Sequence, residues 1–322
     1  PSEGTTEGES ITLSESQAGP EPESQLPSEG EQGQMEESDQ MPEETPSQTE
    51  EFTPQAAGSP NPRIAQTPPT CCNHPYYHSV YRAVSSNGIS WTKTGGLIKN
   101  RASVPAILQR EDGSYILYYV DGIYDTVDCS VSQDGTNFSA GNCRIYGFTE
   151  EKAWDPYIVK LDDGFYRMYF FAPSFESSSN RIMSAISEDG INWLQEEGIR
   201  FEQPGIIDPV VVRMGNTWRM YVWYGEEPSA STIVSAVSQD GLNFIKEKEF
   251  KVGGGVPEVV KLDSGQYAIY YCGFEIEVRT SADGLNWGNG QTVIYGEAGK
   301  IVCDPSVIKD INGQWLMYYK VQ

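Results

Sequence analysis

The hydrophobic pattern of the chain consists of short alternating runs rather than helical periodicity. Five segments share one layout: a proline, a short apolar run, a turn that contains glycine, and an aromatic-rich alternating run. They are residues 104–120, 155–171, 208–225, 256–273 and 304–319. Alternation with period two is typical of β-strands, and a glycine turn between two such runs is typical of a hairpin. The pattern therefore predicts five antiparallel hairpins and no helical segment of comparable strength.

A second motif, Ser-x-Asp/Asn-Gly-x-x-aromatic, separates these hairpins. It occurs at residues 85–91, 132–138, 187–193, 238–244 and 281–287. Asp-Gly or Asn-Gly between apolar runs predicts a type I′ turn, which has positive φ at both central residues. We expect the Asp or Asn to satisfy turn amides and the aromatic residue to pack between repeats. On this interpretation the motif has no catalytic role at Asp134, Asp189, Asp240 and Asp283.

The repeat has a regular length. The prolines at 105, 156, 209, 257 and 305 follow one another at steps of 51, 53, 48 and 48 residues. A period near 50 with four short strands per unit is the signature of a β-propeller. The first turn motif precedes every proline segment, and none follows the last. We therefore predict an all-β, five-bladed propeller over residues 71–322, in which N-terminal strands complete the blade begun by the C-terminal strands.

The first 70 residues have a different composition. They hold 15 acidic residues and a single basic one, Arg63, and so carry −14 of the formal charge of −24. Such a segment buries too little apolar surface to offset its ordering entropy, so residues 1–70 are predicted to be a disordered acidic tail. The remainder carries −10, which argues against a nucleic-acid partner. No apolar run approaches the roughly 18 residues of a transmembrane segment.

An acidic spacer ahead of a compact domain is typical of a tether on an exported protein. We expect an extracellular or cell-surface monomer held through this tail, with a cytosolic tail as the alternative. The even number of cysteines favours an oxidising compartment but allows 15 connectivities, of which Cys129–Cys143 is the expected disulfide because the two flank a hairpin. With two histidines and no metal-type spacing, zinc is not expected. The six cysteines are Cys71, Cys72, Cys129, Cys143, Cys272 and Cys303.

Aspartate precedes the proline in three of the five repeats. These residues are Asp155, Asp208 and Asp304, whereas Val104 and Val256 occupy the equivalent positions. Proline fits at the start of a channel-facing strand, and the residue before it is expected to be extended. The rotational symmetry of a propeller brings the five positions to one mouth of the channel. Three carboxylates would then surround one pocket, and their repulsion would raise the pKa of at least one.

Converging carboxylates are what glycoside hydrolysis requires, since one protonates the leaving oxygen and another activates water or attacks carbon. We predict that Asp155, Asp208 and Glu258, two residues after Val256, form this catalytic set. The residues expected to bind substrate beside them are Trp154, Tyr157, Trp223, Tyr224, Phe274 and Asp304. The same oxygens could hold a cation in the channel, although we expect neither a metal nor another cofactor.

Residues 76–322 resemble the five-bladed propeller glycosidases, which include the arabinanases and β-xylosidases of glycoside hydrolase family 43. The likeness rests on the repeated "DP…V…DG.Y.MYY" units and the "S.DG..W" hairpins. In that family an Asp base, a tuning Asp and a Glu acid begin the inner strands of the first three blades. The resemblance places them at Val104, Asp155 and Asp208, or, one blade later, at Asp155, Asp208 and Val256 with Glu258 nearby.

This resemblance implies an exported glycoside hydrolase that acts on an oligosaccharide or polysaccharide. The valine at position 104 keeps a second interpretation open, namely a non-catalytic surface propeller for glycan binding or adhesion. Fold alone does not decide between them.

Overall fold

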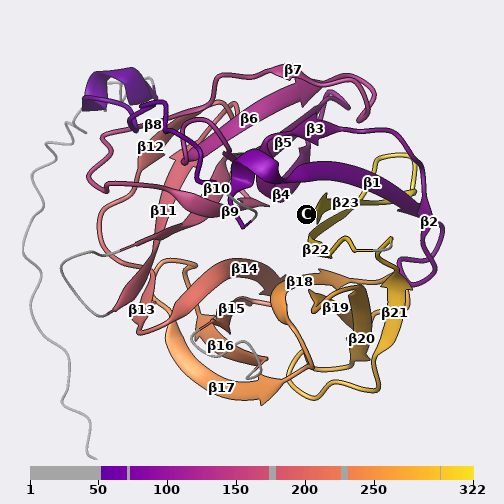
Figure 1. Ribbon diagram of the computed structural model, residues 1–322. Coiled ribbons are helices and arrows are strands. Elements are labelled where there is room, and N and C mark those ends of the chain that lie inside the picture. The colour runs from indigo at the N-terminus through magenta and orange to yellow at the C-terminus, as the bar shows by residue number, and fades with distance from the viewer. Residues whose placement is uncertain (1–51, 71–72, 174–178, 226–230, 298) are drawn as a thin grey trace, which may run out of the picture. The chain divides into compact units, whose positions relative to one another are not determined.

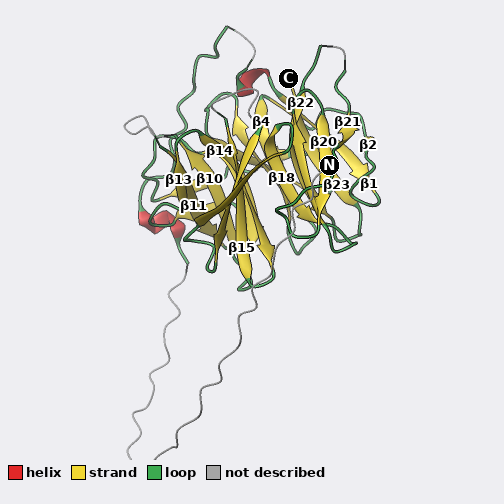
Figure 2. Ribbon diagram, turned by 90° about the horizontal axis from the view of Figure 1, so that it is seen from below, coloured by secondary structure: helices red, strands yellow, loops and turns green. Residues whose placement is uncertain are grey.

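The protein is described by a computed structural model that covers residues 52–70, 73–173, 179–225, 231–297 and 299–322. The compact unit that contains them runs from Glu51 to Gln322. Figure 1 shows five sheets arranged in a ring around a common axis. Figure 2 views the ring from its edge, with the strands running between its two faces. The predicted all-β, five-bladed propeller is confirmed.

Each sheet forms one blade, and we number the blades along the chain. Blade 1 contains β4 (Ala102–Gln109), β5 (Tyr115–Asp121), β6 (Val127–Ser132) and β7 (Ser139–Ala140). Blade 2 contains β9 (Trp154–Lys160), β10 (Tyr166–Ala172), β11 (Asn180–Ser187) and β12 (Asn192–Gln195), with β8 (Arg144–Tyr146) and β13 (Phe201–Gln203) at its edge. Blade 3 contains β14 (Ile206–Met214), β15 (Thr217–Tyr224), β16 (Thr232–Ser238) and β17 (Ile245–Lys251).

Blade 4 contains β18 (Gly255–Lys261), β19 (Tyr267–Cys272), β20 (Ile276–Ser281) and β21 (Gln291–Ile294). Blade 5 contains β22 (Val302–Lys309) and β23 (Trp315–Val321) from the C-terminal end, and β1 (Ser79–Ser85), β2 (Thr92–Lys93) and β3 (Lys99–Asn100) from the N-terminal side. β1 pairs with β23 along its full length, from Ser79 opposite Val321 to Ser85 opposite Trp315. The predicted closure of the ring by N-terminal strands is therefore confirmed.

The hydrophobic core lies between the blades. The second strand of a blade is covered on both faces, so every residue of β5 and of β10 is buried. Five apolar clusters result, one at each boundary between neighbouring blades. Burial on both faces explains why the aromatic-rich runs of the sequence are almost continuously apolar.

A tyrosine on the second strand of each blade bonds to the turn motif of the next blade. The hydroxyl donates to the carbonyl oxygen of the motif's glycine, and the ring packs edge-on against its aromatic residue. The pairs are Tyr118–Gly190 at 2.7 Å, Tyr169–Gly241 at 2.7 Å, Tyr221–Gly284 at 2.8 Å, Tyr318–Gly135 at 2.6 Å and Tyr270–Gly88. The ring contacts are Tyr118–Trp193, Tyr169–Phe244, Tyr221–Trp287, Tyr318–Phe138 and Tyr270–Trp91. The motif is thus the outer connection between blades.

The turn itself differs from the predicted type I′ turn. In the motif of blade 1 only the glycine, Gly135, has positive φ. The Asp134 carboxylate accepts hydrogen bonds from the amides of Thr136 and Asn137, both at 2.8 Å, and Ser132 Oγ accepts from the Gly135 amide at 3.0 Å. The expectation that Asp satisfies turn amides is confirmed. The type I′ assignment is wrong because the side chain stabilises a wider loop in which only the glycine needs a left-handed backbone.

The ordered unit begins earlier than predicted. Residues 52–70 include η1 (Pro54–Ala57) and pack against blades 1 and 2, which the composition of the tail did not indicate. Asn61 donates its backbone N–H to the Ile145 carbonyl at 2.7 Å and accepts the Ile145 N–H on its side chain at 3.0 Å. Arg63 forms a salt bridge with Asp128. The predicted tail boundary at residue 70 is therefore wrong for residues 52–70, and the earlier part of the predicted tail lies outside the described residues.

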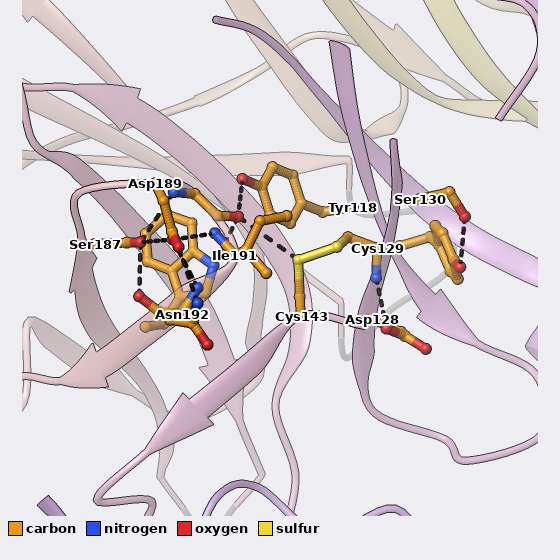
Figure 3. The surroundings of a disulfide bond; sticks show 12 residues. Tyr118, Asp128, Cys129, Ser130, Cys143, Ser187, Asp189, Ile191 and Asn192 are labelled. Carbon is orange, nitrogen blue, oxygen red and sulfur yellow. Dashed lines mark hydrogen bonds between the residues drawn. A yellow bond between two sulfur atoms is a disulfide. The ribbon is translucent and has the colours of Figure 1, made fainter. Parts of the chain in front are cut away.

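Two disulfides are present in the described part of the chain. The predicted Cys129–Cys143 disulfide is confirmed, with 5.5 Å between the Cα atoms. Figure 3 shows it beside Tyr118 and the turn of blade 2 that Tyr118 contacts. The second disulfide, Cys272–Cys303, joins the end of β19 to the start of β22 and so connects blades 4 and 5. Cys71 and Cys72 lie outside the described residues.

Among the described residues, no helix has the length and apolar character that a membrane crossing requires.

Candidate active site at the channel mouth

The five residues that precede the prolines share an unusual backbone. All have a left-handed φ: 46° at Val104, 50° at Asp155, 53° at Asp208, 51° at Val256 and 49° at Asp304. The register of the inner hairpin shifts at the same place in every blade, as it does between Ser103 and Ala106. The expectation of an extended residue is therefore wrong, because a β-bulge absorbs the X-Pro step and overrides the local preference.

The bulges bring all five of these side chains to one cavity of about 390 Å³. This volume is within the range of small-molecule sites. Segment 73–78, which contains η2 (Pro75–Tyr77), also contributes to its wall. The lining residues are Asn73, His74, Pro75, His78, Ser103, Val104, Val120, Asp125, Trp154, Asp155, Ile207, Asp208, Trp223, Val256, Asp304 and Lys320. We call this space the mouth cavity.

Asp304 is tightly held at the mouth cavity. Its Oδ2 atom accepts hydrogen bonds from the Val104 amide at 3.2 Å and from Ser103 Oγ at 3.4 Å. The same oxygen lies 2.9 Å from Lys320 Nζ in an ion pair whose side chains are 3% and 12% exposed. Ser103 Oγ is also 2.9 Å from His78 Nδ1. These contacts satisfy the Asp304 charge within the protein.

Within the described residues, Asp155 and Asp208 form no ion pair, although the charge of Lys320 acts on both. The Asp155 carboxylate accepts a hydrogen bond from the backbone N–H of Asp208. Burial and the charge of Asp304 raise the pKa of Asp155 to about 7, against the opposing effects of this bond and of Lys320. Asp208 is 7% exposed, and no hydrogen bond to its carboxyl is found within the described residues. Burial, followed by the charges of Asp155 and Asp304, holds the pKa of Asp208 well above its usual range.

Glu258 is not among the residues of the mouth cavity, but it shares a second space with this pair. That space is narrow, about 20 Å³, and is lined by the five prolines, by the five residues that precede them and by Glu258. Its Oε1 atom accepts the Val307 amide of blade 5 at 3.1 Å, and burial raises the pKa of the carboxyl. Ser306, the equivalent residue in blade 5, accepts the Ile107 amide of blade 1 at 3.0 Å in the same manner. Glu258 therefore connects neighbouring blades.

The aromatic residues predicted to bind substrate are distributed over several places. Trp154 and Trp223 line the mouth cavity, and Tyr157 lines the narrow space with Glu258. Tyr224 is not among the residues of either space. Phe274 is 76% exposed and lies outside both.

The most important residue that sequence reasoning missed is Lys320. It lies near the end of an apolar run, "WLMYYKV", and its only sequence signal is that it interrupts this run. Cys303 is its partner in the β22–β23 register, which places the ammonium beside Asp304. Because Lys320 already pairs with Asp304, the carboxyls left for a cation are those of Asp155 and Asp208.

Comparisons with known proteins give similarity of structure but not of sequence. No protein-family model and no curated protein matches the chain. A thermostable family-43 glycoside hydrolase has a TM-score of 0.57 at 15% identity, covering 69% of this chain and 88% of its own. A GH43_1 enzyme from Xanthomonas citri, complexed with xylotriose, has a TM-score of 0.52 at 14% identity. The match covers 69% of this chain and 86% of the enzyme.

A protein of another activity is also similar. An N-acetylgalactosamine deacetylase from F. plautii has a TM-score of 0.51 at 12% identity, covering 75% of this chain and 95% of its own. Identities this low establish a shared fold and leave activity to the site itself. The chain has the five-bladed β-propeller fold found in the family-43 glycoside hydrolases.

Proposed function

We propose that this protein is an exported carbohydrate-active propeller that hydrolyses glycosidic bonds at the mouth cavity, with Asp208 as general acid and Asp155 as general base. The observation that carries the proposal is the state of Asp208. Its carboxyl is buried, has no hydrogen-bond partner in the described residues, and lines a cavity that Asp155 also lines. A carboxyl in such surroundings keeps its proton near neutral pH.

The two carboxyls suit different tasks. The pKa of Asp155 is raised to about 7, and burial holds the pKa of Asp208 well above its usual range. A catalytic base that ionises near the working pH and an acid that stays protonated there are the usual requirements of acid–base catalysis. In the proposed reaction, Asp208 protonates the glycosidic oxygen and Asp155 removes a proton from the attacking water. The reaction needs no cofactor.

Glu258 is left out of this acid–base pair, although it belonged to the catalytic set expected from the sequence. Its carboxyl accepts a hydrogen bond from the Val307 amide and lines the narrow space instead of the mouth cavity. Trp154 and Trp223 provide the apolar walls that saccharide rings favour. Export is supported by the two disulfides, which persist in oxidising compartments. The tail as a surface tether remains part of this proposal.

A second candidate is a propeller that binds glycans without hydrolysis. Two observations favour it. Val104 stands where the family resemblance places the catalytic base. Both Asp304 and Asp155 accept a backbone amide of the following blade, so these two carboxylates also have a structural role.

Turnover of aryl arabinosides and aryl xylosides tests the proposal. The full chain should release the aryl group, and Asp155→Asn and Asp208→Asn should each reduce kcat by at least about 100-fold. Asp263→Asn is the matched control, because Asp263 is exposed and pairs with Lys309 away from the mouth cavity. Hydrolysis is excluded if the wild type turns over no faster than the two mouth variants. Saccharide binding without turnover supports the second candidate.

A further inference from the structure

We propose that the saccharide bound at the mouth cavity carries a free amino group, whose ammonium lies between Asp155 and Asp208 against Trp223. This inference depends on the proposed function only in taking the mouth cavity as a saccharide site. It names the substrate class: an amino sugar that is not N-acetylated.

The first argument is the balance of charge. Two of the four carboxylates that line the mouth cavity have a cation of their own: Lys152 pairs with Asp125, and Lys320 pairs with Asp304. The other two form no ion pair within the described residues, although the charge of Lys320 acts on both. Burial disfavours their ionised forms, so a cation beside these two carboxyls would stabilise the charge that either of them carries. The four carboxylates are Asp125, Asp155, Asp208 and Asp304.

The second argument is an ammonium site within the same wall. Lys152 Nζ lies 4.9 Å from the centre of the Trp154 ring and forms an ion pair with Asp125. A carboxylate and an indole ring together thus hold an organic ammonium here, as expected from cation–π attraction. Asp155 and Asp208 with Trp223 offer the same combination of groups without a cation.

The third argument is the state of the groups that would receive the ligand. Asp208 is more than nine-tenths buried and lines the cavity, and its carboxyl makes no hydrogen bond within the described residues. Trp223 Nε1 is also buried and lacks a hydrogen-bond partner there. An amino sugar provides donors for the carboxyls, while its ring oxygens and hydroxyls can accept from the indole N–H.

The chemistry of the wall favours an organic ammonium over other ions. An anion would be repelled as Asp155 ionises, and Lys320 is already committed to Asp304. A calcium ion seeks six to eight oxygen ligands, whereas this side of the cavity offers two carboxyls and an indole ring. The electrostatics and the aromatic surface therefore point to the same ligand class.

Binding should depend on pH through Asp155. The charged groups that act on it are Asp208, Asp304 and Lys320, and His74 and His78 line the same cavity. An ammonium stabilises the ionised form of the carboxyl, so affinity should rise as Asp155 loses its proton. Between about pH 5.5 and pH 7 a primary amine of this kind stays largely protonated. A change in affinity over that range therefore reports the carboxyl.

Isothermal titration calorimetry on the full chain, with the methyl glycosides of glucosamine and galactosamine, tests the proposal. At pH 7 we expect these to bind at least about ten-fold tighter than their N-acetylated forms, and to lose about ten-fold in affinity at pH 5.5. Asp208→Asn and Asp155→Asn should each remove most of this preference. Asp263→Asn should keep it. Circular dichroism of each variant verifies that it is folded.

Three results would overturn the inference: equal affinity for the amine and its N-acetylated form, a preference that survives in both mouth variants, or displacement of the amine by calcium chloride alone. Hydrolysis is scored separately with the aryl glycosides. An amine preference without turnover leaves this inference standing and removes the proposed hydrolysis. Turnover without an amine preference supports the proposed hydrolysis and overturns this inference.

Discussion

The Asp304 carboxylate accepts the backbone N–H of Val104 at 3.2 Å, across the boundary between blades 5 and 1. The two residues occupy equivalent positions in neighbouring blades. Asp155 likewise accepts a hydrogen bond from the Asp208 amide, across the boundary between blades 2 and 3. An aspartate before the proline therefore links its own blade to the following one. Asp208 is the exception, because within the described residues its carboxyl forms no such bond.

Replacing Asp304 by alanine should strongly destabilise the fold. The change leaves the Lys320 ammonium, which is 12% exposed, without its counter-charge and the Val104 amide without its acceptor. We expect a loss of about 3–5 kcal/mol in the free energy of unfolding, measured by urea titration at neutral pH. Asp208→Ala is the control, since Asp208 has neither contact, and it should cost much less. Equal losses in the two variants would contradict the structural role of Asp304.

Replacing Val104 by asparagine should stabilise the protein. A β-branched residue at φ 46° is strained by about 1–2 kcal/mol, whereas Asn adopts the left-handed region more readily. We expect the free energy of unfolding to increase by about 1 kcal/mol. Val131→Asn in β6, where the backbone is an ordinary strand, should be destabilising. The strain argument fails if both substitutions change stability in the same direction.

The tyrosine hydroxyl groups that connect the blades should contribute unequally to the stability of the fold. Tyr169 is the only donor found for the Gly241 carbonyl within the described residues, whereas the Gly190 carbonyl receives both Tyr118 and the Trp193 indole. Tyr169→Phe therefore leaves a buried carbonyl unpaired and should cost about 1–3 kcal/mol. Tyr118→Phe should cost about 1 kcal/mol or less. Thermal unfolding of the two variants measures the difference, and a larger loss in Tyr118→Phe would refute this ranking.

The blade count and the ring closure could be predicted from sequence because both depend on repeated local features. Five prolines near a 50-residue period and five turn motifs locate the hairpins, and their stagger predicts that β1 joins β23. The left-handed residue before each proline could not be predicted in this way. Local sterics favour an extended residue there, whereas each of these residues lies at a register shift of its inner hairpin, which is a property of strand pairing and not of local sequence.

The site was less accessible to sequence reasoning than the fold. Symmetry predicts which pre-proline residues are equivalent, but not which of them the protein already satisfies. Asp304 forms an ion pair with Lys320 and accepts the Val104 amide, and Glu258 accepts the Val307 amide. The Lys320 contact depends on the register of the β22–β23 hairpin, and the two amide contacts depend on how neighbouring blades pack. Composition likewise could not reveal that Asn61 bonds twice to Ile145 within an otherwise polar segment.

Replacing Asp155 by asparagine should stabilise the protein at high pH and leave it unchanged at low pH. The pKa of Asp155 is about 7 in the folded protein, against about 3.9 in an unfolded chain. Below about pH 4 both states hold the proton, so the carboxyl has no pH-dependent effect. Between pH 4 and 7 the unfolded chain releases the proton first, which progressively destabilises the wild type. The asparagine side chain cannot ionise, and its oxygen can still accept the Asp208 amide.

The advantage of Asp155→Asn should therefore be near zero at pH 4, grow through pH 7 and then level off at no more than about 4 kcal/mol. Urea unfolding of both proteins from pH 4 to pH 8.5 measures it. Asp263→Asn, at an exposed carboxyl, controls for the general effect of removing one negative charge. A difference between wild type and Asp155→Asn that stays constant over this range would show that Asp155 ionises as an ordinary carboxyl, and the assignment of Asp155 as a base that ionises near neutral pH would then be wrong.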